Sequence, residues 1–167
     1  MAKRAPDTSP AKGKGHAQVE TVGLDMGKVP PQAIDMEEAV LGALLLEPNA
    51  AIDVVGVIKP EYFYKESHRK IFAAITDLVS AHNPVDIYTV AEELKKNNLL
   101  DEVGGPYYLS QLSMRVAAAS HLDYHSKVLT QKFIQRELIT TAYGILRDAF
   151  DDAIPADELL NASQQKL

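Results

Sequence analysis

The segment closest to a catalytic motif is rich in glycine and lies near the N-terminus. Gly13-Lys14-Gly15 is the only approach to a phosphate-binding loop in the chain. Such a loop ends in Gly-Lys-Ser/Thr, because backbone amides and the lysine bind the phosphates while the hydroxyl binds magnesium. The hydroxyl is missing here, and Gly104-Gly105 does not continue into a dinucleotide-binding fingerprint. The sequence therefore predicts no nucleotide-binding site.

Side chains that could bind a metal or transfer protons are present, but their spacing suits neither task. Of the five histidines, only His121 and His125 lie one helical turn apart. We expect them to be solvated histidines of a helix rather than a metal-binding pair. Adjacent acidic residues such as Glu92-Glu93 point in different directions and cannot act on one substrate. We therefore predict no catalytic, cofactor-binding or metal-binding residue and no enzyme active site in this chain.

Composition narrows the class of protein. The chain has 167 residues, of which 46% are hydrophobic, which suits one globular domain or one domain with an appendage. It holds no cysteine, so disulfides and thiolate metal sites are excluded, as is usual in a reducing compartment. No apolar run approaches the roughly 20 residues that span a bilayer, and the N-terminus lacks the apolar stretch of a signal peptide. We expect a cytoplasmic protein.

Charge is distributed unevenly along the chain. Residues 1–15 carry a net charge of +3, whereas the whole chain carries −6, so the remainder carries −9. An acidic body is a poor electrostatic match for a phosphate backbone, which argues against tight nucleic-acid binding by the folded part. Residues 1–29 are rich in Lys, Gly, Pro and Ala without apolar periodicity, and we expect a disordered basic tail there.

Helical periodicity and helix-stop signals predict an all-α chain. Asp35 and Glu38 form a capping-box-like start for the first helix, and Asp86 is expected to cap a later one. The expected helices span about 35–48, 49–57, 66–81, 86–96, 106–116, 121–150 and 155–167. The first five form a compact globule of five to six helices over 30–116. Residues 117–167 form a long helical hairpin, whose second helix we expect to be cut short at Leu167.

A cluster of aromatic residues follows a helix break at Pro60. Tyr62, Phe63 and Tyr64 are too bulky and apolar for a solvated loop, so we expect them to fold onto a core or onto a partner. His68 and Phe72 share one face of the helix that follows. The predicted structural core contains Leu41, Phe63, Tyr64, His68, Phe72, Leu94 and Leu112.

The predicted hairpin carries more apolar surface than one neighbouring helix needs. At 100° per residue, the apolar positions from Leu138 to Phe150 fill an arc of roughly 160°, whereas one antiparallel neighbour needs a stripe of about 100°. The surplus predicts a second neighbour, and a four-helix dimer is the simplest solution. The alternative is that the hairpin packs back on the globule. The predicted dimer interface comprises Leu138, Ile139, Ala142, Tyr143, Leu146 and Phe150.

Five sequence motifs, in order along residues 29–167, resemble those of one protein family. They are Glu38 to Leu45 after Pro30-Pro31-Gln32, Phe63-Tyr64 with His68, Pro84-Val85-Asp86, Val103-Gly104-Gly105, and Arg136-Glu137-Leu138-Ile139. This series resembles the N-terminal domain of bacterial DnaB-type replicative DNA helicases. The family's ATPase motor, which uses ATP and magnesium, is not among these residues, so the resemblance implies a domain cut before the linker to the motor.

The resemblance also implies partners. Such domains pair through their hairpins into a trimer of dimers, which forms a collar on a hexameric ring. The collar docks the C-terminal helicase-binding domain of primase and so couples unwinding to priming. A helicase loader is a further possible partner, and DNA is bound only by the full hexamer. No membrane partner is expected.

Exposed aromatic or apolar side chains near the hairpin are the physical candidates for primase contacts, because aromatic anchors dominate interfaces. We predict Tyr108, Ile139 and Ile145 for this role, with ordinary core or dimer packing as the alternative. Two rival functions stay open: the helicase-binding domain of a primase, and an unrelated all-helical interaction or DNA-binding module. A DNA-binding module predicts a basic recognition helix, whereas the longest helix mixes Lys127 and Asp123 with further charges of both signs.

Overall fold

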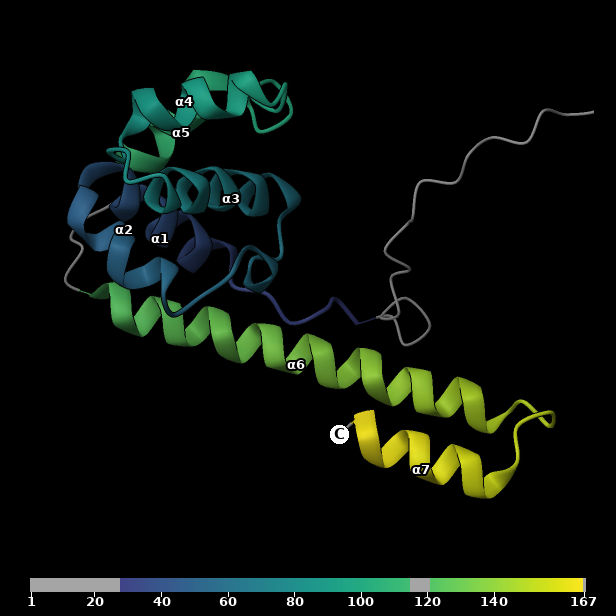
Figure 1. Cartoon of the computed structure of the whole chain (residues 1–167). Coiled ribbons are helices and arrows are strands. Elements are labelled where there is room, and N and C mark those ends of the chain that lie inside the picture. Colours follow the sequence, from purple (N-terminus) through teal and green to yellow (C-terminus); the bar gives the residue numbers. More distant parts are fainter. Residues whose placement is uncertain (1–27, 115–120, 167) are drawn as a thin grey trace, which may run out of the picture.

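The computed structural model describes residues 28–114 and 121–166, and within these ranges it contains helices and no strand (Figure 1). The elements are α1 (Ile34–Leu46), α2 (Pro48–Val55), η2 (Pro60–Tyr62), α3 (Glu66–Ser80), α4 (Ile87–Lys96), α5 (Gly105–Met114), α6 (Leu122–Ala149) and α7 (Ala156–Lys166). Helices α1–α5 form the globule, and α6 with α7 forms the hairpin. The predicted all-α fold is confirmed. The expected tail falls almost wholly outside the described residues.

Helix α1 is the centre of the globule. It is apolar on nearly all sides, and Val40, Leu41 and Leu44 have no exposed surface. A helix of this kind must have neighbours all round. It packs against α2, α3 and α5 within the globule and against α6. The N-terminal half of the long helix therefore contributes to the same core, in which Leu129 is buried.

Of the two helix N-caps predicted from the sequence, the structure confirms one and contradicts the other. Asp86 caps α4 as expected: its carboxylate accepts the Thr89 amide at 2.8 Å, and the Thr89 hydroxyl accepts the Asp86 amide at 3.0 Å. The predicted cap at Asp35 is wrong. The N-cap of α1 is Ala33, which makes no side-chain cap. Asp35 lies in the first turn, where its negative charge favours the helix dipole without capping it.

A glycine turn connects α4 to α5. Gly104 and Gly105 have φ angles of +102° and +69°, a region that side chains rarely adopt. A Cβ at Gly104 would also lie 2.9 Å from the Cβ of Tyr108. The turn therefore requires glycine at Gly104, and it places Tyr108 in the first turn of α5.

The hairpin extends far beyond the globule (Figure 1). Helix α6 has 28 residues, which corresponds to about 42 Å at 1.5 Å per residue. Its first half lies along the globule, against α1 and η2, and its second half projects away. Helix α7 runs back antiparallel to that second half. The observed limits of α6 lie within one residue of the expected 121–150.

Candidate protein interaction surface

The aromatic break that follows Pro60 faces the core of the globule. Phe63 and Phe72 are fully buried, and their ring centroids are 4.9 Å apart. Tyr64 is half-buried, so it lies at the edge of the core. The other predicted core residues are all buried: Leu41, His68, Leu94 and Leu112.

A buried polar network joins α1, α3 and α5. The carboxylate of Glu37 contacts Nδ1 of His68 at 2.7 Å, and both side chains are buried. It also accepts the backbone amides of Tyr64 at 2.5 Å and Lys65 at 3.3 Å. Because α3 has no side-chain cap of its own, Glu37 supplies acceptors at its N-terminus from another helix. The buried carboxyl oxygens are thereby hydrogen-bonded, as burial requires.

Tyr108 completes this network through its hydroxyl, while part of its side chain stays accessible. Its hydroxyl lies 2.7 Å from Nε2 of His68, accepts Nζ of Lys65 at 3.0 Å and lies 3.4 Å from a carboxylate oxygen of Glu38. The tyrosine is half-buried. Glu37 was not among the residues predicted from the sequence. The available signal was a carboxylate in an otherwise apolar helix, because such a residue needs a partner.

Helix α7 covers only one flank of the projecting part of α6. The half-buried positions Thr141, Gly144, Ile145 and Asp148 follow the i, i+3, i+4, i+7 spacing of a single helix face. This flank is mostly small or polar. The structure thus places Ile145, which was predicted for the primase interface, on the side of α6 that faces α7.

The opposite side of α6 is apolar and exposed. Leu138, Leu146 and Phe150 have exposed fractions of 56%, 51% and 80%. Ile139 and Ala142 are also exposed, while Tyr143 is half-buried. We call the exposed set Leu138, Ile139, Ala142, Leu146 and Phe150 the hairpin face. At 100° per residue it spans an arc of about 120°, and the intrachain neighbour α7 lies on the other flank.

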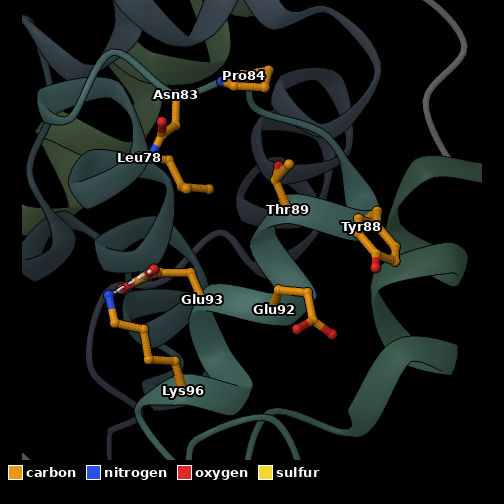
Figure 2. A pocket seen from close by; sticks show the side chains of 8 residues that line it. All are labelled: Leu78, Asn83, Pro84, Tyr88, Thr89, Glu92, Glu93 and Lys96. Atoms are coloured by element: carbon orange, nitrogen blue, oxygen red, sulfur yellow. Dashed lines mark hydrogen bonds and ion pairs between the residues drawn. The ribbon is translucent and has the colours of Figure 1, made fainter.

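Other parts of the described chain offer no catalytic arrangement. A shallow groove lies between the end of α3 and α4 (Figure 2), lined by Leu78, Asn83, Pro84, Tyr88, Thr89, Glu92, Glu93 and Lys96. Within it, Glu93 pairs with Lys96 at 3.2 Å, and Glu92 points away from Glu93. Across residues 28–114 and 121–166, no three potential metal ligands gather, and no helix is both long and apolar enough to cross a membrane.

The histidine pair at the start of α6 is in contact. The ring centroids of His121 and His125 are 6.3 Å apart. Burial lowers the pKa of His125 below its usual value of 6.5, and the neighbouring His121 lowers it further. The neutral form of His125 is therefore favoured in the folded protein.

In the part of the chain that the structure describes, a helical globule is joined to a projecting hairpin with an exposed apolar face. Residues 29–131 match the family described as the DnaB-like helicase N-terminal domain. Because that match covers more than half of the chain, the chain belongs to this family. The predicted resemblance is confirmed.

Curated relatives are replicative helicases. The chain is 39% identical over 153 residues to the replicative DNA helicase DnaB of Rhodothermus marinus, covering 90% of this chain and 16% of the relative. It is 37% identical over 140 residues to the replicative DNA helicase DnaB of Geobacillus stearothermophilus, covering 84% of this chain and 31% of the relative. The chain thus spans at most about a third of these two relatives.

Solved structures show the same fold. The crystal structure of the N-terminal domain of DnaB helicase from Mycobacterium tuberculosis aligns with a TM-score of 0.78 at 32% identity, covering 83% of this chain and 98% of that one. A DnaB-like replicative helicase, solved in a study of its interactions with primase, aligns with a TM-score of 0.68 at 25% identity, covering 81% of this chain and 32% of that one.

Proposed function

We propose that this chain is the collar domain of a hexameric replicative DNA helicase, which pairs through its hairpin and docks primase. One observation carries the proposal: a chain of this family exposes an apolar hairpin face that its own α7 does not cover. In the whole protein, ATP-driven unwinding would come from a motor domain that binds ATP and magnesium. The expected setting is the cytoplasm.

A second copy of the chain is the occupant that best suits the hairpin face. The face is built from aliphatic and aromatic side chains on one long helix, and an isologous contact places the same face on both partners. Two antiparallel hairpins would then form a four-helix bundle and bury these side chains. Three such dimers would complete a hexameric collar.

Neighbouring positions on α6 provide a matched test of pairing. Ile139 lies on the hairpin face, whereas Thr140 is exposed and lies outside it. We expect Ile139→Asp, alone or with Leu146→Asp, to reduce the mass measured by sedimentation to that of one chain, because a charge would be buried between apolar surfaces. Thr140→Asp should keep the wild-type mass. An unchanged mass for the Ile139→Asp, Leu146→Asp double variant would contradict pairing through this face.

Primase docking is the second part of the proposal. It is supported by the helicase of similar fold that was studied with its primase. We assign the contact to Tyr108, Ile139 and Ile145. The helicase-binding domain of the cognate primase should be captured by the wild-type chain and lost on combining Tyr108→Ala with Ile145→Ala. Capture at wild-type strength would contradict this assignment.

Because Tyr108 belongs to the buried polar network with Glu37 and His68, its alanine variant requires a further control. Tyr108→Ala removes both a surface ring and the hydroxyl bound to His68, so folding and docking would change together. Tyr108→Phe removes the hydroxyl alone. Loss of primase capture by Tyr108→Ala with retention by Tyr108→Phe would support direct contact of the ring. Equal loss in both variants would assign the effect to the internal network instead.

A further inference from the structure

The hairpin leaves the globule at Arg136. One terminal nitrogen of its guanidinium donates to the carbonyl of Pro31 at 2.9 Å. The other donates to the carbonyls of Tyr62 at 2.8 Å and Glu61 at 3.3 Å. These acceptors precede α1 and belong to η2, so one side chain of α6 ties together two segments that are distant in sequence.

Aromatic rings surround this contact. Phe133, one helical turn before Arg136, stacks on Tyr62 with ring centroids 4.5 Å apart and an interplanar angle of 15°. The guanidinium carbon lies 5.9 Å from the ring centroids of both Phe133 and Tyr64. Positions near a ring face favour a cation. We call Arg136, Phe133, Tyr62 and Tyr64 the exit clamp.

Arginine is suited to this position for a geometric reason. The last carbonyls of a one-turn helix such as η2 have no partner within the helix, and a guanidinium can donate to several acceptors in one plane. A lysine ammonium is a compact charge without this fork. Burial lowers the pKa of Arg136, the nearby Arg69 lowers it as well, and Glu37 opposes the change. The side chain nevertheless remains a cation.

We infer that Arg136 is a positioning residue, which fixes the direction of the hairpin relative to the globule. Helix α6 continues 13 residues beyond Arg136 to Ala149, which corresponds to about 20 Å. A rotation of about 10° at the exit clamp would therefore move the tip by roughly 3 Å. The further consequence, that the clamp sets the angle between globules in a dimer, rests on the proposed pairing through the hairpin.

An intrachain distance tests the inference directly. Because the chain contains no cysteine, Lys95→Cys on α4 and Asp152→Cys in the turn after α6, at the hairpin tip, can each carry a spin label, and both positions are exposed. The doubly labelled chain is mixed with excess unlabelled chain, so that double electron–electron resonance reports the distance between the two labels of one molecule. We expect a narrow distribution of label-to-label distances in the chain that keeps Arg136. The distribution should be at least twice as wide in Arg136→Ala and in Arg136→Lys.

Two comparisons keep the outcome decisive. Arg147 is an exposed arginine of the same helix that pairs with Asp148, and Arg147→Ala should leave the distribution narrow. If Arg136→Ala does not fold by circular dichroism, Arg136→Lys, which keeps the charge and the aliphatic stem, decides. A narrow, unshifted distribution in a folded Arg136 variant would overturn the inference. Sedimentation of the same samples reports pairing separately, so loss of the dimer alone does not count against the clamp.

Discussion

The globule has a buried apolar core, whereas the projecting half of the hairpin, as far as the structure describes it, has none of its own. In the globule even Glu37 is buried and fully hydrogen-bonded, and the rings of Phe63 and Phe72 have no exposed surface. In the hairpin, Leu146 and Phe150 remain exposed beside a single helical neighbour. The globule thus buries its core within one chain, whereas the hairpin leaves an apolar face that a second copy would cover under the proposed pairing.

The largest expected effect contrasts two phenylalanines. Phe72→Ala should lower the free energy of unfolding by about 3–5 kcal/mol, because it leaves a cavity in a filled core. Phe150→Ala should change it by less than about 0.5 kcal/mol in the monomer, because the ring is already in water. Urea denaturation at concentrations where the chain is monomeric measures both. Similar losses for the two variants would erase the proposed difference between the regions.

Glu37→Gln tests whether the polar network is part of the globule's stability. The substitution turns one of the two acceptor oxygens that serve His68 and two backbone amides into an NH2 donor, and we expect a loss of about 2–3 kcal/mol. Glu92 provides the control, since it is an exposed carboxylate whose ion pair with Lys95 is long at 3.8 Å. Glu92→Gln should be nearly neutral. A neutral Glu37→Gln would show that the network has little effect on stability.

Gly144→Ala probes the projecting half of α6. A Cβ at this position would meet nothing within 4 Å, so alanine fits and favours the helix. We expect a gain of about 0.5–1 kcal/mol, visible as a higher midpoint in thermal unfolding. A loss of stability would contradict this expectation and would show that α7, which lies on this flank, packs closely against Gly144.

The smallest expected effect is a pH dependence at the base of α6. The pKa of His125 is lowered on folding, mainly by burial, so the unfolded chain binds this proton more readily. Stability should therefore be fully present above the unfolded pKa of about 6.5 and should fall as the pH drops below it. Melting points between pH 5 and pH 7.5 would show this slope, and His125→Gln should flatten it. An identical slope in that variant would assign the dependence to other groups.

Much of the fold could be predicted because its signals are local. Asp86 with Thr89 marks a helix start through a bond that spans three residues, and Pro48 and Pro60 mark breaks through their missing amide hydrogens. The start of α1 was misplaced, because a carboxylate in the first turn resembles a cap in sequence even where Ala33 occupies the cap position. The apolar arc of α6 could also be predicted from the sequence, since it depends only on helix periodicity.

The hydrogen bonds between residues far apart in sequence could not be predicted from local patterns. Glu37 reaches His68 and the amides before α3 across about 30 residues of sequence, and Arg136 reaches carbonyls on two separate segments. Such pairs depend on helix directions that no local pattern encodes. For the same reason the sequence could count Ile145 within the apolar arc but could not tell that α7 would lie on that flank.

From the sequence alone, an all-helical chain, an apolar surplus on its longest helix and a resemblance to the N-terminal domain of DnaB-type helicases could be inferred, because helix periodicity, caps, breaks and short motifs are properties of neighbouring residues. The tertiary structure was needed to show which side of that helix stays exposed, that the hydroxyl of Tyr108 joins the buried network, and that Arg136 donates to carbonyls of two separate segments. Those outcomes depend on side chains meeting across long stretches of chain, and folding alone brings them together.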